Sequence, residues 1–123
     1  RPIPIEIDDF YDLSLVEDII SGKYDIMFTF KAICEFVTKE RFEQDNAYEH
    51  IAKFFMNNLT TNGIAIIEDV TSYNNVASEW LPKMMDKGLR SIDCNVINQL
   101  LIVSHSKKKR DISKVAWRVF TKK

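Results

Sequence analysis

Residues able to bind or react with a ligand follow three apolar segments of the chain. They are Asp8 and Asp9 after residues 3–7, Phe30 and Lys31 where residues 24–30 end, and Glu68 and Asp69 after residues 64–67. Carboxylates accept hydrogen bonds and protons, ammonium groups bind anions, and aromatic rings cover planar ligands. If the three segments are parallel strands, these side chains meet at the carboxyl ends of the sheet, where ligands bind in open α/β folds.

The last of these pairs carries a geometric restriction. Adjacent residues of a strand point to opposite sides, so we expect only one of Glu68 and Asp69 to reach a substrate or a metal easily. The two histidines, His50 and His105, have no partners recognisable in the sequence, and we expect structural or solvent-exposed roles for them.

The apolar pattern predicts the elements that would position these residues. Predicted strands are residues 3–7, 24–30, 64–67, 100–103 and 115–120. Predicted helices are residues 14–20, a helix that opens at 45 or 46 and is closed by Asn62-Gly63, and residues 76–87. Strands that alternate with helices favour an α/β fold with a mainly parallel sheet and helices on both faces. The last two strands are predicted to form an antiparallel hairpin at one edge. Residues 24–30 are apolar nearly throughout, which predicts a central strand buried on both faces.

Polar residues mark the ends of the predicted helices. Ser14 is predicted to cap the first helix, and either Asp45 or Asn46 opens the second. Pro82 lies inside the third predicted helix, which is therefore kinked or begins late, and Gly88 is its predicted end.

Composition limits the classes of function. The chain has 123 residues, 46% of them hydrophobic, which predicts one domain spanning 1–123. Its formal charge of −1 gives no global attraction to nucleic acid or anionic membranes. No apolar run approaches the ~20 residues of a membrane span, so we expect a soluble, cytoplasmic protein without a membrane partner. Cys34 and Cys94 lack metal-binding spacing, which predicts free thiols and no metal site.

Taken together, these segments resemble the later two-thirds of class I S-adenosylmethionine-dependent methyltransferases. The similar features are an acidic strand end (IEIDDFYDL), a tyrosine-aspartate pair opening a strand (YDIMFTFKAICEF), and a long helix leading through Asn62-Gly63 into IAIIEDV. The final helix and closing hairpin look like WLPKMMDKGL and QLLIVSHSKKKRDISKVAWRVFTKK. The resemblance covers essentially the whole chain and implies a Rossmann-like, three-layer αβα domain.

One family feature is absent from this sequence. Complete family members begin with a strand and a glycine-rich turn against the cofactor, whereas the only glycines here are Gly22, Gly63 and Gly88. The chain also starts at Arg1, with an apolar segment almost at once. We therefore expect an incomplete domain that binds S-adenosylmethionine and transfers a methyl group only when the preceding segment is present.

The resemblance also implies roles for the candidate site residues. Asp8 or Asp9 with Phe10 would lie near the adenine of the cofactor, and Phe30 would contribute to the same cofactor site. The alternative for the two acids is a solvated turn.

Residues 28–35 occupy the position of the family's catalytic loop. Lys31 and Glu35 would orient the methyl acceptor there, with Glu35 as a candidate base. Alternatively, these two side chains face water or pair across one helical turn. The segment lacks a Pro-Pro-aromatic loop and Cys34 lacks a preceding proline, so nucleic-acid acceptors are disfavoured; Cys34 is then a small buried side chain.

Two functions remain open from the sequence. The first is a methyltransferase domain whose acceptor the sequence does not identify. The second is a non-catalytic Rossmann-like module that binds a protein or RNA partner. The basic run 107–110 would contact phosphates or form a solvated loop tip. An exposed sheet edge left by missing strands would favour a homodimer.

Overall fold

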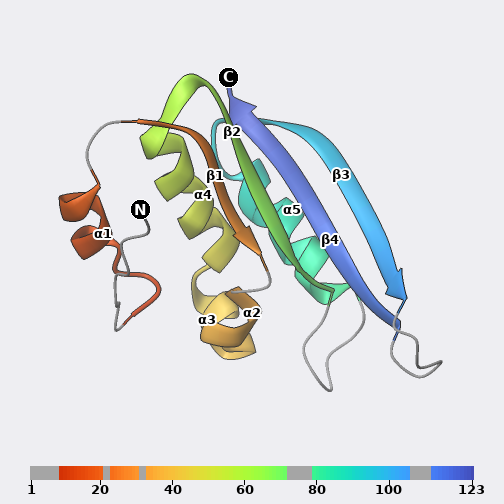
Figure 1. The fold of residues 1–123 in the computed structure, drawn as a ribbon. Coiled ribbons are helices and arrows are strands. Elements are labelled where there is room, and N and C mark those ends of the chain that lie inside the picture. Colours follow the sequence, from red (N-terminus) through yellow and green to blue (C-terminus); the bar gives the residue numbers. More distant parts are fainter. Residues whose placement is uncertain (1–8, 21–22, 31–32, 72–78, 106–111) are drawn as a thin grey trace.

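The computed structural model describes residues 9–20, 23–30, 33–71, 79–105 and 112–123 (Figure 1). Its elements are α1 Ser14–Ile19, β1 Tyr24–Phe30, α2 Ile33–Phe36, α3 Lys39–Gln44, α4 Ala47–Asn58, β2 Leu59–Val70, α5 Trp80–Arg90, β3 Cys94–His105 and β4 Ile112–Lys122. The predicted strand over residues 3–7 lies outside the described residues. No helix within these ranges has the length and apolar content needed to cross a lipid bilayer.

The described strands form a four-stranded sheet in the order β1-β2-β4-β3. β1 and β2 are parallel, whereas β4 runs antiparallel to both β2 and β3. The prediction of a mainly parallel sheet is therefore not confirmed, because two of the three strand pairings are antiparallel. The closing hairpin accounts for the difference: it folds back so that β4 enters the sheet beside β2 and leaves β3 at the edge.

Helices α4 and α5 cover the same face of this sheet (Figure 1). The ring of Phe55 on α4 stacks on Phe120 of β4 with centroids 6.5 Å apart. Two residues earlier in β4, Arg118 pairs with Asp86 of α5, and residues two apart in a strand share a face. We call the other side of the sheet the open face, because no helix covers it in the described part of the chain. The predicted layers of helices on both faces therefore reduce to one layer within these residues.

Helix α4 confirms one prediction and corrects another. Asn46 is its N-cap, and the side-chain oxygen accepts hydrogen bonds from the backbone N–H groups of Tyr48 and Glu49 at 2.9 and 3.1 Å. The helix ends at Asn58 and β2 begins directly at Leu59, five residues earlier than predicted. The pairing explains this start, because Tyr24 lies opposite Leu59 and the following β2 residues bulge before Ile64.

The other helix ends also differ from the predictions. Ser14 is the first residue of α1 rather than its cap, and Leu13 occupies the cap position without a side-chain hydrogen bond. Helix α5 begins late, at Trp80, so that Pro82 falls in its first turn, where no intrahelical N–H is needed. It continues past Gly88 to Arg90. A Cβ at Gly88 would lie 2.7 Å from the backbone nitrogen of Glu49, so this close approach of α5 to α4 requires glycine.

Strand β1 was predicted correctly as a strand, and its predicted central position is not confirmed among the described strands. It is the edge of the described sheet, and its side chains on the open face are largely uncovered: Ile26 is 61%, Phe28 59% and Phe30 44% exposed. An apolar sequence indicates that a strand can be buried on both faces. It does not show that helices or further strands cover those faces.

Candidate functional site

The carboxyl ends of β1 and β2 bring two of the predicted site residues side by side. In the parallel register, Phe30 at the end of β1 lies opposite Glu68 of β2. On the other side of β2, Glu68 lies opposite Trp117 of β4. Three residues separated widely in the sequence therefore form one row across the sheet, at the end where ligands bind in open α/β folds.

Glu68 and Asp69 point to opposite faces, as their adjacency predicts. Asp69 is fully buried on the helix side and accepts a hydrogen bond from the Tyr48 hydroxyl of α4 at 2.8 Å. It also accepts from the backbone N–H of Val70 at 2.9 Å. Asp69 thus ties α4 to β2, and Glu68 is the member of the pair that faces the open side.

Glu68 is 8% exposed, and its side chain has no hydrogen-bond or ion-pair partner among the described residues. The surrounding row is aromatic. The rings of Phe30 and Trp117 pack edge to face, with centroids 5.2 Å apart and an interplanar angle of 64°. The ring of Phe28 stacks on that of Phe30 with centroids 4.7 Å apart. The indole nitrogen of Trp117 is also buried without an acceptor in the described structure. This row of Phe28, Phe30, Glu68 and Trp117 is named the aromatic row below.

Asp9 and Phe10 lie in a different cluster, on the segment that precedes α1. The Asp9 carboxylate pairs with Arg41 of α3 at 3.1 Å and accepts from the backbone N–H of Tyr11 at 3.0 Å. The Tyr11 hydrogen bond and the Arg41 guanidinium hold the pKa of Asp9 below its usual value. The Arg41 guanidinium lies 4.5 Å from the centre of the Tyr11 ring, and Phe10 meets that ring edge-on at 5.6 Å.

These contacts fix the segment to α3 and leave half of the Asp9 side chain exposed, at 49%. Asp9 therefore keeps free acceptor capacity for an amine, while its position is set by Arg41. Asp8 lies outside the described residues. The predicted adenine contacts of Asp8, Asp9 and Phe10 stay predictions.

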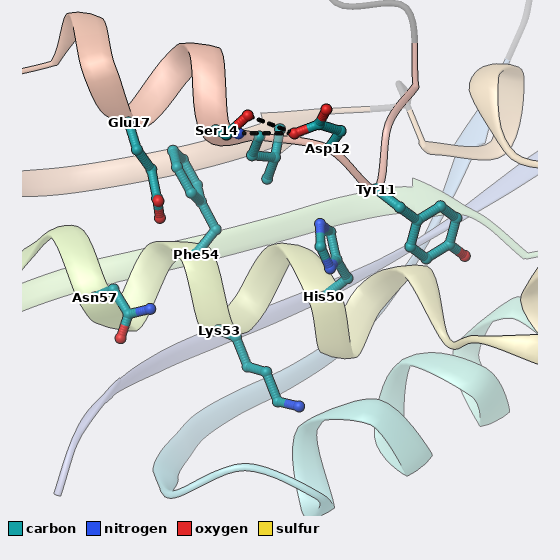
Figure 2. Close-up of a pocket in the computed structure, with 9 residues that line it drawn as sticks. Tyr11, Asp12, Ser14, Glu17, His50, Lys53, Phe54 and Asn57 are labelled. Carbon is teal, nitrogen blue, oxygen red and sulfur yellow. Dashed lines mark hydrogen bonds between the residues drawn. The ribbon is translucent and has the colours of Figure 1, made fainter.

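A hollow of about 310 Å³ lies next to this cluster, between α1 and α4 (Figure 2). Its polar lining is mixed in charge, with Asp12 and Glu17 from the segment of α1 and Lys53 from α4. The Asp12 carboxylate accepts a hydrogen bond from the Ser14 hydroxyl at 2.6 Å. His50 also lines the hollow, and its Nε2 is buried without a partner among the described residues.

The predicted structural role of His50 fits its surroundings. Its ring lies 5.1 Å from the Tyr11 ring and 5.9 Å from that of Phe10, so it packs in an aromatic cluster. Burial, followed by the nearby Asp45 carboxylate, raises the pKa of Tyr11 to about 12. Tyr11 is therefore protonated at neutral pH and donates its hydroxyl hydrogen to the Asp45 carbonyl.

The predicted catalytic pair remains a prediction. Lys31 lies outside the described residues. Glu35 belongs to the short helix α2, but its side chain, like that of Cys34, is outside the described part. Ile33 of the same helix is 1% exposed and lies in the core, whereas Phe28 and Phe30 of the same predicted loop are 59% and 44% exposed. In the described ranges, no group of three histidine, cysteine or acidic side chains lies close enough to hold a metal ion.

Trp117 is the site residue that sequence reasoning missed. The segment around it was predicted as a strand, and alternation along β4 places Trp117 on the face opposite Phe120. The sequence does not indicate which strand lies beside β4. Its pairing with β2 is what brings the indole of Trp117 beside Glu68.

The described fold is mixed α/β with a four-stranded sheet, consistent with a Rossmann-like architecture. No protein-family model matches the chain, and no curated protein matches its sequence. Among solved structures, the chain resembles the crystal structure of TehB from Haemophilus influenzae, with a TM-score of 0.49 and 16% sequence identity. The match covers 96% of this chain and 40% of the TehB chain. This likeness is remote, so it indicates nothing about what the chain binds.

Proposed function

We propose that this chain is the carboxy-terminal part of an S-adenosylmethionine-dependent methyltransferase domain. The observation that carries the proposal is the unfinished side of the sheet. β1 is apolar along its open face yet lies at the edge of the described sheet, with Ile26 and Phe28 about 60% exposed. An edge of this kind normally carries charges, proline or a cover, and β1 has none of these on its open-face side chains.

The side on which β1 is uncovered is the side where the family resemblance implies further strands. Added strands beside β1 would pair its free backbone groups, and helices joining them would cover the exposed rings. The same segment would bring the glycine-rich turn that this sequence lacks. The proposal thus accounts for the exposed edge and the missing cofactor loop with one segment.

The described residues fit only part of the cofactor. Asp9 offers a half-exposed carboxylate that could accept from the exocyclic amine of a purine, and Phe30, in the separate aromatic row, offers a half-exposed ring that could cover one. None of the described segments offers a glycine-rich loop for the rest of the molecule. S-adenosylmethionine, when bound, supplies an electrophilic methyl group. The proposed part of this chain is to hold the adenine and, through Lys31 and Glu35, to orient the acceptor.

The test is a calorimetric titration of S-adenosylhomocysteine into two proteins. One is the 123-residue chain and the other is extended to the natural start of its reading frame. We expect binding at micromolar strength or better only for the longer protein, and a loss of affinity of about tenfold when its Asp9 is changed to Asn. If neither protein binds, the methyltransferase proposal is wrong.

The exposed edge also favours a second candidate, a module that binds a partner by strand addition. A groove of about 310 Å³ runs beside β1 and is lined by apolar side chains, among them Val16 of α1, Ile20 just after that helix, and Ile26 and Phe28 of β1. An extended peptide could hydrogen-bond to β1 there and place alternate side chains in the groove. The extended protein separates the two candidates, because its added strands would occupy the groove only in a complete methyltransferase domain.

A further inference from the structure

We infer that the aromatic row is a binding site for a small organic cation, such as an alkylammonium group, which sits against the Glu68 carboxylate. The inference concerns binding alone and does not depend on methyl transfer. It follows from the charge, the rings and the donor that β1, β2 and β4 bring together.

The charge of Glu68 is the first step. Glu68 as a whole residue is 8% exposed, and no described residue gives its carboxylate a hydrogen bond or a cation. Such a group is costly, and a native fold normally pairs it. Asp69 shows the contrast one residue later, because its fully buried carboxylate accepts a hydrogen bond from Tyr48. Glu68 is therefore the acidic group at this sheet end that lacks the partner its burial requires.

The rings are the second step. Phe30 and Trp117 flank Glu68 on its two neighbouring strands, and their centroids are 5.2 Å apart. The faces of aromatic rings attract cations, and tryptophan does so most strongly. An apolar group would remove the rings from water but leave the carboxylate without a partner. A water molecule would give the carboxylate a hydrogen bond but would not neutralise its charge. A methylated or alkylated ammonium satisfies both, since it carries the positive charge on a surface of C–H groups.

The indole N–H is the third step. The Nε1 atom of Trp117 is buried without an acceptor among the described residues. Residues directly opposite on antiparallel strands have Cβ atoms roughly 5 Å apart, so a ligand held at Glu68 lies beside the Trp117 side chain, and a small movement of the ring would bring its N–H to the ligand. A suitable probe therefore carries an oxygen acceptor close to its cationic centre. Choline has this arrangement, and its neutral isostere 3,3-dimethyl-1-butanol has the same shape without the charge.

The test uses the 123-residue chain labelled with ¹⁵N and titrated with choline. The chain has two tryptophans, so the two indole N–H signals report separately, and Trp80 on α5 serves as an internal reference. We expect choline to shift the Trp117 signal saturably, with a dissociation constant in the millimolar range, and to leave the Trp80 signal in place. The neutral isostere should bind at least about tenfold more weakly.

Two variants connect the binding to the proposed residues. Glu68→Gln keeps the shape of the side chain and removes its charge, and it should reduce choline affinity to that of the isostere. Glu43→Gln, on the exposed surface of α3, is the matched control and should bind choline as the unchanged chain does. Preserved signal dispersion in both variants shows that the fold is intact.

Three results would overturn the inference. They are the absence of a saturable Trp117 shift with choline, equal affinity for choline and the isostere, and unchanged choline affinity in a folded Glu68→Gln variant. Each would show that the charge of Glu68 is not available to a cation at this site.

Discussion

The ion pair between Arg118 and Asp86 gives the most direct test of how this fold is held together. Arg118 lies on β4 and its side chain is 8% exposed, while Asp86 on α5 is 29% exposed. The contact is bidentate, with Nε–Oδ1 and Nη2–Oδ2 distances of 2.7 and 3.2 Å. Changing Asp86 to Ala removes both bonds and leaves the guanidinium buried, with its Nη1 still donating to the Trp117 carbonyl at 2.9 Å.

The size of the effect follows from this geometry. Breaking a fully buried pair costs about 3–5 kcal/mol, and the partial exposure of Asp86 places this pair at about 2–3 kcal/mol. For a chain of this length, that loss should lower the midpoint of thermal unfolding by roughly 8–15 °C. The double variant Asp86→Ala with Arg118→Met removes both charges and should recover most of the loss, giving a coupling energy of about 2 kcal/mol.

Urea unfolding followed by circular dichroism measures all four members of this cycle. The m-value should stay constant across them, so that changes in midpoint report changes in stability. If Asp86→Ala costs less than about 0.5 kcal/mol, or if the coupling energy is that small, the argument from buried charge is refuted and the pair is only a surface contact.

Three further predictions rest on contacts described above. Asn46→Ala removes a cap with two backbone hydrogen bonds and should cost about 1–2 kcal/mol in urea unfolding, whereas Thr38→Ala, at a more exposed cap with one long bond of 3.3 Å, should cost less than half as much. The hydrogen bond from the Tyr11 backbone and the pair with Arg41 hold the folded-state pKa of Asp9 below the ordinary 3.8, so these contacts stabilise the fold above about pH 4. That contribution is lost as the pH falls through the folded pKa; an Asp9→Asn variant whose stability deficit does not shrink as the pH is lowered from 4 would contradict this. Ile26→Lys should abolish any concentration-dependent dimer seen by light scattering without destabilising the monomer, because Ile26 is 61% exposed at the sheet edge.

The sequence predicted the local elements better than their arrangement. Helix α4 and its cap at Asn46, the strand β1 and the late start of α5 around Pro82 could be read from periodicity, capping residues and the proline. These features depend on neighbours within a few residues, which the sequence displays directly.

The errors concern partners that are distant in the sequence. The early start of β2 at Leu59 comes from pairing with Tyr24, 35 residues away, and no turn signal announces it. Ser14 was predicted as a cap from its residue type, but Asp12 takes its hydroxyl and Leu13 stands at the helix start. The edge position of β1 in the described sheet could not be predicted either, because the hydrophobicity of a strand indicates that it can be buried and does not identify its neighbours.

The candidate site divides in the same way. That Glu68 and Asp69 point to opposite faces follows from the strand period alone, and the structure bears it out. Asp69 accepts a hydrogen bond from Tyr48, whereas Glu68 lies in the aromatic row. This difference depends on which helix and which strand lie on each face of the sheet. The sequence shows that both side chains are carboxylates, whereas only the fold shows which carboxylate is free to bind a ligand.

The place of β4 in the sheet has a consequence for how the chain is made. Residues 112–122 are translated after the other described strands, yet they form the strand that joins β2 to β3. Until they emerge from the ribosome, β3 has no hydrogen-bonded neighbour among these strands, and β1 and β2 form only a two-stranded ribbon, which is marginal in water. Folding of the sheet must therefore wait for this segment, and the apolar faces of β1 and β2 stay exposed to chaperones and to other nascent chains during that interval. A premature stop codon before residue 112 would thus release an aggregation-prone product rather than a shortened domain.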